Sequence, residues 1–363
     1  MPAIFLQAFL LISYYITMMR MIALTSNNLI MDTITLPRRL YCPFPPRINK
    51  QVARAEQHTL SWVRKFGLIQ GEEKIEVTRR QGYAYMVGRM FPDAEIETFC
   101  AYNDLNTLLF LVDDYLDQEE LTVSGGNSTA AIETFIAGIK SILYNPEIEV
   151  TGSEPVLDAF AELWGRMRLM GKPDWVNKYR ESIASIFDAA MWQHRNIEAG
   201  TWPTVQEFML RRQYIGAANL ATDCVEMIYD LDLPTEIWDT WWMVGMTELC
   251  RNTICWANDL FSHSKELSTG EYHNLVSLFS YHQDLSREDA IEEVIRIHDA
   301  QVAAFIAIKD TRPAAPPQHE PHVVTYISVL ESIMRGNIDW SDQETTRYPH
   351  RYLHEIRDQK VQY

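Results

Sequence analysis

Apolar residues recur along most of this chain at intervals of three and four positions, with polar residues between them. This spacing places the apolar side chains on one face of an α-helix, whereas the strict alternation typical of half-buried strands is scarce. The fold class is therefore predicted to be all-α. The predicted helices cover residues 48–67, 72–90, 93–118, 129–143, 154–170, 174–198, 204–229, 234–268, 271–283, 286–309 and 319–337.

Turn-forming residues separate these helices. Two or more residues drawn from glycine, asparagine and proline occur at each of 125–127, 145–146 and 200–203, where they favour turns over helix. Thr204 stands three residues before Glu207, which is the spacing of a helix-capping box. Residues 34–47, before the first helix, contain prolines that cannot continue a helix, and we expect an extended strap there.

The predicted helices show no dividing linker, no repeat and no shift in composition. We therefore expect a single domain over residues 34–356, followed by a short tail at 357–363. Residues 1–33 form an extension whose first part, 3–19, carries no charge. It has neither a basic region in front nor a small-residue cleavage site, which a signal peptide would have. A short membrane anchor would explain it, and so would an over-extended start, with a later methionine as the true start.

The composition is that of a globular protein, with 47% apolar and 22% charged side chains. The formal net charge of −17 argues against a nucleic-acid groove as the main function. An anionic ligand would need metal cations or a few placed arginines to offset this field. The five cysteines include no Cys-x-x-Cys pair, so neither a disulfide framework nor a zinc site is indicated, and a cytoplasmic protein is expected.

An aspartate-rich motif ends one predicted helix, where residues 109–117 read LFLVDDYLD. At about 100° per residue, Asp113 and Asp117 lie about 40° apart on one helix face, whereas Asp114 points roughly 100° away. Carboxylate oxygens suit a hard divalent cation such as Mg²⁺. Asp113 and Asp117 are therefore candidate metal ligands, although a solvated helix end would show the same pattern.

A second polar stripe interrupts an otherwise apolar helix. Asn258, Ser262 and Glu266 are spaced four residues apart, so an amide oxygen, a hydroxyl and a carboxylate share one helix face. The residues at 254–256 and 260–261 are apolar, which argues against a simple solvent-facing stripe. The spacing predicts a second cation site built from oxygen ligands.

Together, the two motifs resemble the DDxx(D/E) and NDxxSxxxE motifs of bacterial and fungal class I terpene synthases. The resemblance spans roughly residues 34–354 and implies a single-domain helical bundle around a central apolar active-site cavity. Prenyl chain-elongating transferases carry a second aspartate-rich motif where this chain has NDLFS at 258–262. The resemblance therefore favours cyclisation over chain elongation.

The resemblance also implies roles for residues outside the two motifs. Gly216 matches the effector position at a helix break, and Ile215 matches the linker position before it. Asp114 is expected to pair with Arg347 when the site closes. The residues expected to contact diphosphate are Arg212, Lys265, Arg347 and Tyr348.

Apolar and aromatic side chains close to these motifs are candidates for the cavity wall. An aromatic face attracts a carbocation, and each such contact is worth on the order of 0.5–2 kcal/mol. Core packing explains any single one of these residues equally well. The candidates are Leu109, Phe110, Ile215 and Trp340, with Phe187 and Tyr214 as further ones.

The implied function is an Mg²⁺-dependent terpene cyclase that converts a linear prenyl diphosphate into a terpene hydrocarbon or alcohol. Three Mg²⁺ ions are expected with bound substrate, and Mn²⁺ is an expected substitute. Farnesyl diphosphate is the first expected substrate and geranylgeranyl diphosphate the second, because Leu109 stands where an aromatic residue is frequent.

No nucleic acid, membrane contact or obligatory protein partner is expected, and a homodimer is left open. Two alternatives remain at this point: a prenyl chain-elongating transferase, and a non-catalytic helical scaffold whose acidic stripes face solvent.

Overall fold

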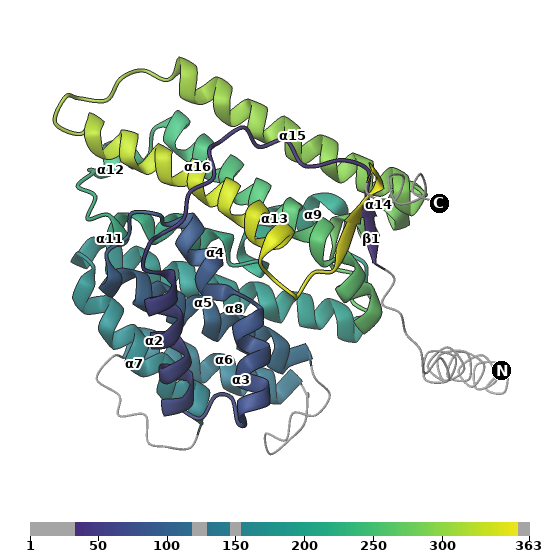
Figure 1. Cartoon of the computed structure of the whole chain (residues 1–363), viewed down its shortest axis with the longest axis horizontal. Coiled ribbons are helices and arrows are strands. Elements are labelled where there is room, and N and C mark those ends of the chain that lie inside the picture. Colours follow the sequence, from purple (N-terminus) through teal and green to yellow (C-terminus); the bar gives the residue numbers. More distant parts are fainter. Residues whose placement is uncertain (1–32, 118–128, 146–153, 355–363) are drawn as a thin grey trace, which may run out of the picture.

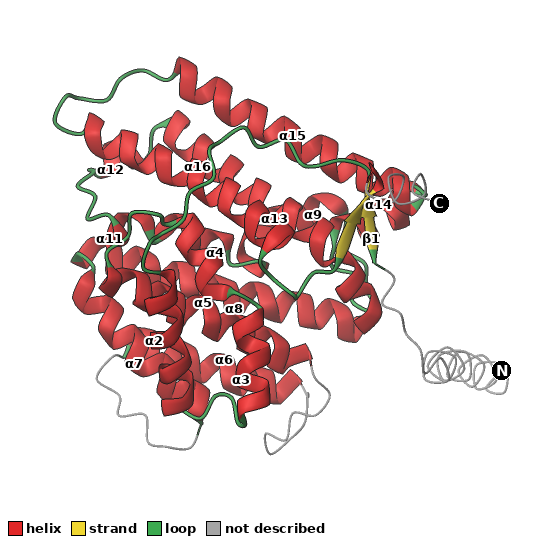
Figure 2. Cartoon of the chain, in the orientation of Figure 1, coloured by secondary structure: helices red, strands yellow, loops and turns green. Residues whose placement is uncertain are grey.

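Helices make up nearly all of the regular structure in the computed structural model, which describes residues 33–117, 129–145 and 154–354 (Figure 2). The predicted all-α fold class is confirmed. The helices are α2 (Val52–Lys65), α3 (Glu72–Arg80), α4 (Tyr83–Met90), α5 (Ile96–Asp117), α6 (Thr129–Tyr144), α7 (Pro155–Met170), α8 (Pro173–Ala199), α9 (Val205–Ile215), α10 (Ala218–Asp223), α11 (Val225–Ile228), α12 (Thr235–Trp238), α13 (Trp241–Thr269), α14 (Leu275–Gln283), α15 (Arg287–Thr311) and α16 (Glu320–Gln343).

Two groups of helices pack on each other (Figure 1). Helix α13 lies along α15 and α16, while α5 packs against α2, α4 and α7. The contact between α4 and α16 joins the groups, and Arg89 on α4 reinforces it through two 2.7 Å hydrogen bonds to the Glu344 carboxylate. The aspartate-rich helix and the helix with the second polar stripe therefore belong to a single packed body.

Local sequence explains where several helices begin and end. Thr204 and Glu207 form the predicted capping box at the start of α9, which is confirmed. Helices α8 and α13 end at Gly200 and Gly270, both in the left-handed backbone conformation that glycine adopts without a steric penalty.

Some predicted helices are wrong in extent. The segment 72–90 is two helices, because Gly82 takes a left-handed conformation with φ 66° between α3 and α4. The segment 204–229 is three helices rather than one, and the chain turns between α9 and α10 at Gly216 and Ala217, where Ala217 has φ 51°. Apolar periodicity continues across these breaks, so it could not reveal them.

Two further boundaries also differ. The segment 234–268 begins with the single turn α12 before α13, and the last predicted helix, 319–337, extends to Gln343. The additional turns of α16 bring Trp340 onto the helix, fully buried. The Trp340 indole Nε1 donates to the Gln81 carbonyl at 3.0 Å, across the break between α3 and α4.

A short parallel ribbon, which the sequence analysis missed, joins the two ends of the described chain. Strand β1 (Ile34–Leu36) pairs with β2 (His350–Tyr352), with Ile34 opposite His350. Each strand is only three residues long, so neither carries a recognisable alternation. The predicted extended strap follows β1 and runs across α15 and α16 to α2 (Figure 1).

Two predictions about the ends of the chain stay predictions. Among the described helices, none offers an apolar stretch sufficient to cross a bilayer. The uncharged segment 3–19 and the tail 357–363 lie outside the described residues.

The contact between α4 and α16 depends on Gly336. A Cβ atom at this position would lie 2.8–3.0 Å from backbone atoms of Arg89 and Met90, which cannot move aside as a flexible side chain can. We expect Gly336→Ala to lower the free energy of unfolding by about 1–3 kcal/mol. The matched control is Gly165→Ala in α7, where a Cβ meets nothing within 4 Å and alanine should add about 0.5–1 kcal/mol. Chemical denaturation measures both, and an unchanged midpoint for Gly336→Ala would contradict the expectation.

Candidate active site

The aspartate-rich motif ends α5 beside the C-terminal segment that carries Arg347. The buried guanidinium of Arg347 donates to both oxygens of Asp114 at 2.7 Å, and Nη2 also reaches Asp113 Oδ2 at 3.1 Å. Lys265 on α13 lies 3.5 Å from Asp114 Oδ1. Asp114 therefore links three separate elements, whereas the Asp113 side chain is 60% exposed and free to bind a further partner.

These contacts shift the pKa values of Asp114 and Arg347. Burial alone would raise the pKa of Asp114, but the hydrogen bonds and charge of Arg347 outweigh it and lower this pKa. Burial would likewise lower the pKa of Arg347, yet the surrounding Tyr348 and Asp114 raise it. Both groups are therefore charged near neutral pH.

The second polar stripe lies on α13 opposite Arg212 of α9. Arg212 is buried, and its Nη2 donates to Asn258 Oδ1 at 2.7 Å. Its Nε donates to Asp259 Oδ1, also at 2.7 Å. Ser262 Oγ donates to the Asn258 carbonyl at 2.8 Å, which directs this hydroxyl along the helix. Desolvation raises the pKa of Glu266, and the neighbouring Asp259 carboxylate raises it further.

One dipeptide connects the two motifs. Arg347 contacts the aspartates of α5, and the hydroxyl of the next residue, Tyr348, accepts a 3.2 Å hydrogen bond from Asn258 Nδ2 on α13. The ribbon holds this dipeptide in place, because β2 begins at His350, two residues after Tyr348. The sequence motifs thus meet at one place through the C-terminal segment.

The donor set fits a hard divalent cation. Asp113, Asn258, Ser262 and Glu266 offer carboxylate, amide and hydroxyl oxygens, which are the ligands that such cations prefer. In the parts of the chain that the structure describes, no three His, Cys, Asp or Glu side chains form a metal cluster. Asp117 lies in the last turn of α5, and its side chain is outside the described residues.

Gly216 has a packing role beside Arg212. A Cβ at this position would lie 2.3 Å from Arg212 Nη1, so any side chain would displace the guanidinium. Ile215, which precedes Gly216 at the end of α9, is partly buried. The break after α9 therefore shapes the surroundings of Arg212.

Four aromatic rings lie together beside Arg347. Phe110 stacks on Tyr83 with ring centroids 4.4 Å apart, and Trp340 lies 5.8 Å from Phe110 and 5.7 Å from Tyr348. The Arg347 guanidinium stands 5.1 Å from the Phe110 centroid. Tyr83 lies outside every sequence motif, so nothing in the sequence signalled its place beside Phe110.

The other cavity candidates are more dispersed. Leu109 is partly buried, as is Tyr214, whereas Phe187 is buried against Phe135 in an edge-on contact with centroids 6.3 Å apart. Core packing accounts for the position of Phe187 without a role in a cavity.

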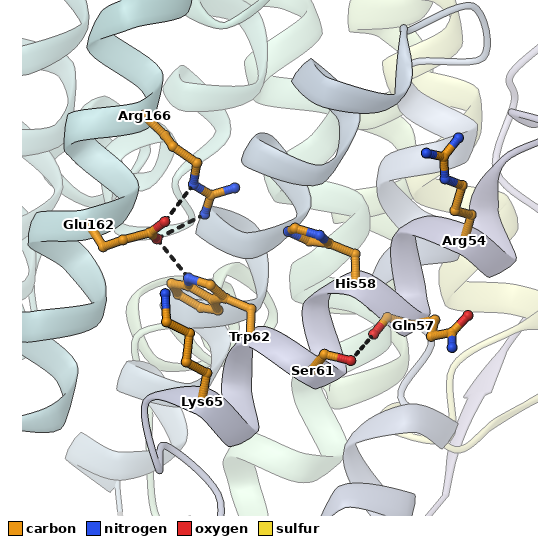
Figure 3. A pocket seen from close by; sticks show the side chains of 8 residues that line it. All are labelled: Arg54, Gln57, His58, Ser61, Trp62, Lys65, Glu162 and Arg166. Carbon is orange, nitrogen blue, oxygen red and sulfur yellow. Dashed lines mark hydrogen bonds and ion pairs between the residues drawn. The ribbon is translucent and has the colours of Figure 1, made fainter.

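The pocket in Figure 3 lies away from these motifs, between α2 and α7, with a volume of about 510 Å³. Its Arg166 donates to the buried Asp104 at 2.8 Å and to Glu162 at 3.1 Å. Glu162 also accepts a hydrogen bond from the Trp62 indole. Arg166 and Glu162 are thus engaged with each other and with neighbouring groups, and we assign no ligand to this pocket. The lining residues are Arg54, Gln57, His58, Ser61, Trp62, Lys65, Glu162 and Arg166.

Comparison with solved structures shows which class of fold this is. Linalool/nerolidol synthase from Streptomyces clavuligerus superposes with a TM-score of 0.75 at 20% identity, covering 84% of this chain and 100% of that one. The predicted class I terpenoid synthase fold is confirmed.

The chain belongs to the family described as terpene synthase family 2, C-terminal metal binding, whose model matches residues 104–304. Germacrene A synthase from Nostoc punctiforme is 28% identical over 313 residues, covering 85% of this chain and 94% of the relative. (+)-T-muurolol synthase from Roseiflexus castenholzii is 27% identical over 310 residues, covering 85% and 93%. The protein is a terpene cyclase, and the elongating and scaffold alternatives are set aside.

His273, in the segment that follows α13, gives the stability of this region a pH dependence. It is buried against the rings of Trp192, Phe208 and Tyr272, and neither ring nitrogen has a hydrogen-bond partner among the described residues. Burial lowers the pKa of His273 from 6.5 to about 4. Because the unfolded chain then binds a proton more readily than the folded one, stability is lost as the pH falls from 6.5 towards 4.

We expect this effect to be about 2 kcal/mol between pH 7 and pH 5, at 1.36 kcal/mol per unit of pKa shift. His273→Phe keeps a ring and removes the titration, so its stability should fall less over this range. Urea denaturation of both proteins at pH 7 and pH 5 measures the difference, and equal losses would contradict it.

Proposed function

We propose that this terpene cyclase ionises farnesyl diphosphate and cyclises the resulting carbocation, with release of diphosphate. The convergence of the two oxygen-bearing helices on Arg347 and Tyr348 carries the proposal, because it brings cationic groups and metal ligands to one place. The name of the Roseiflexus relative states that it cyclises (2E,6E)-farnesyl diphosphate, which supports the C15 substrate. Geranylgeranyl diphosphate is the second candidate.

The proposed metal is Mg²⁺, with three ions in the complete complex and Mn²⁺ as a substitute. When bound, the ions would act as Lewis acids that stabilise the departing diphosphate. The residues proposed to hold them are Asp113, Asp117, Asn258, Ser262 and Glu266. Diphosphate would contact Arg212, Lys265, Arg347 and Tyr348.

The protein's own residues position the leaving group. Asp114 holds Lys265 and Arg347 beside each other, so two cations face the same region before substrate arrives. Asp259 and Asn258 hold Arg212 in the same way on the other motif. Such preorganised charges stabilise developing negative charge without a reorganisation cost at the moment of reaction.

The aromatic rings beside Arg347 would act after ionisation. Phe110, which is partly exposed and backed by the stacked Tyr83 ring, would contact a carbocation, at on the order of 0.5–2 kcal/mol per contact. The closely packed rings also exclude water, which would otherwise quench the cation.

We propose that residues 34–356 form the catalytic domain. The pairing of β1 with β2 supports this, because it makes residue 34 part of the same unit as the Arg347 segment. Residues 1–33 would lie outside that unit.

Product analysis tests the proposal. The purified protein is incubated with C10, C15 and C20 prenyl diphosphates, with Mg²⁺, with Mn²⁺ and with a chelator, and the extracts are analysed by gas chromatography–mass spectrometry. We expect a cyclic C15 hydrocarbon or alcohol that depends on the metal. Cyclic product from the C20 substrate alone would move the assignment to diterpenes, and no product from any of them would overturn it.

A further inference from the structure

Asn274, which sequence analysis did not single out, is completely buried where α14 begins. Its side-chain Nδ2 donates two hydrogen bonds of 2.7 Å, one to Glu266 Oε2 and one to the Asp259 carbonyl. Its Oδ1 accepts from the Val276 backbone N–H at 2.9 Å. All three contacts agree on the orientation of the amide, because a carboxylate and a carbonyl can only accept and a backbone N–H can only donate.

Capping of α14 explains only one of these contacts. A helix N-cap needs an oxygen acceptor, and serine or aspartate supplies it as well as asparagine does. The two Nδ2 donors take no part in the cap. They face Glu266 and the Asp259 carbonyl, both within the second motif, and no other common capping side chain would provide two such donors.

The Nδ2 contact orients one candidate metal ligand. A glutamate side chain has several rotamers, and fixing one of them costs conformational entropy when the metal binds. Asn274 occupies Oε2 of Glu266 and so holds the carboxylate in one direction before any ligand arrives. Partners of this kind behind a metal ligand commonly change metal affinity by about 10-fold to 100-fold when they are mutated.

The next residue, Leu275, contacts the aspartate that holds Arg212, a proposed diphosphate contact. The Leu275 backbone N–H donates to Asp259 Oδ2 at 3.1 Å, while Asp259 Oδ1 holds Arg212. Residues 274 and 275 therefore fix Glu266 and Arg212 from the same short segment. Movement of this segment would disturb both the metal ligand and the arginine.

We propose that Asn274 is a positioning residue for the reaction, which aligns Glu266 for metal binding through its side-chain amide. The inference rests on the proposed function, because it takes Glu266 as a metal ligand. In this proposal Asn274 acts through Glu266 and not by direct contact with substrate or metal. Its capping contact and its Glu266 contact use different atoms, so substitutions can separate them.

Two variants of Asn274 keep the cap and lose the positioning contact. Asn274→Asp has the same size and retains a capping oxygen, but it turns an acceptor towards Glu266 and the Asp259 carbonyl. Asn274→Ser also retains a capping oxygen, and its short hydroxyl adds no charge. The control is Ser286→Ala, which removes the N-cap of α15, where the hydroxyl binds Asp289 on its own helix.

Two readouts are measured for each full-length protein. One is the Mg²⁺ concentration that gives half-maximal turnover, recorded separately from kcat. The other is the rise in melting temperature on adding Mg²⁺ with inorganic diphosphate, which reports ligand binding without turnover. Loss of a cap that matters only for folding would lower the melting temperature of the ligand-free protein. It would change neither the Mg²⁺ requirement nor the rise in melting temperature on adding Mg²⁺ with diphosphate.

We expect both Asn274 variants to need about 10-fold or more Mg²⁺ and to show a smaller rise in melting temperature. Ser286→Ala should melt earlier yet keep the wild-type metal requirement. If Asn274→Asp does not fold, Asn274→Ser carries the test.

If the folded Asn274 variants keep the wild-type Mg²⁺ requirement and the wild-type rise in melting temperature, the inference about Asn274 is overturned, while the proposed function stands. If the wild-type protein itself shows no response to Mg²⁺ with diphosphate, the proposed function fails together with the inference.

Discussion

Replacing Asn258 with alanine is expected to lower kcat/KM about a thousand-fold, which corresponds to about 4 kcal/mol of lost transition-state stabilisation. Asn258 is a proposed metal ligand, and its side chain also contacts Arg212 at 2.7 Å and Tyr348 at 3.2 Å. The substitution therefore removes an oxygen ligand and the link between two proposed diphosphate contacts. Steady-state turnover with farnesyl diphosphate and Mg²⁺ measures the effect.

Asn252→Ala is the matched control for this prediction. Asn252 lies on the same helix, and its amide donates to Gln301 at 3.1 Å rather than towards the motifs. We expect its turnover to stay within a few-fold of the wild type. Comparable turnover of the Asn258 and Asn252 variants would contradict the assignment of Asn258.

Removing the carboxylate of Asp259 should have the largest effect on stability. Asp259 is completely buried, and its ion pair with the buried Arg212 is 2.7 Å long. Asp259→Ala leaves the guanidinium in the interior without its counter-charge, which typically costs about 3–5 kcal/mol. Because Arg212 would also move, we expect turnover to fall with stability. Chemical denaturation at constant pH measures the loss.

A surface ion pair provides the comparison. Asp188 pairs with Lys140, and the Asp188 side chain is 66% exposed, so solvent screens this pair. Asp188→Ala should cost at most about 1 kcal/mol and leave turnover unchanged. An Asp259 variant as stable as the Asp188 variant would show that Arg212 finds another partner or is stable without one.

The predictions for Asn258 and Asp259 both concern side chains that hold Arg212 in an acidic protein. The chain has a formal net charge of −17, yet Arg212, Lys265 and Arg347 all lie beside the two motifs. Each of them is paired with a carboxylate or an amide oxygen from those motifs. Acidic residues therefore place the cations that an anionic substrate would contact.

Regular patterns in the sequence predicted much of the fold and part of the site. Apolar periodicity located the helices, and local chemistry located the capping box at Thr204. The stripe of Asn258, Ser262 and Glu266 could be read directly, because a helix places every fourth residue on one face. The breaks at Gly82 and Ala217 were missed, since they depend on backbone conformations that apolar periodicity does not encode.

The residues that complete the site belong to no continuous motif. Tyr83 stacks on Phe110 and Asn274 holds Glu266, but neither residue shows anything unusual in its own stretch of sequence. Pairing of β1 with β2 joins residues more than three hundred positions apart, and strands this short have no detectable pattern.

The sequence by itself determined the all-α class, the two oxygen-bearing stripes and, through their order, the family. Those features are local, because helical geometry fixes which side chains share a face within a few turns. Only the tertiary structure decided that Arg347 meets Asp114, that Arg212 meets Asp259 and that Asn274 meets Glu266. The first two of these contacts join residues far apart in the sequence and the third crosses a turn between helices, so they depend on how the helices pack.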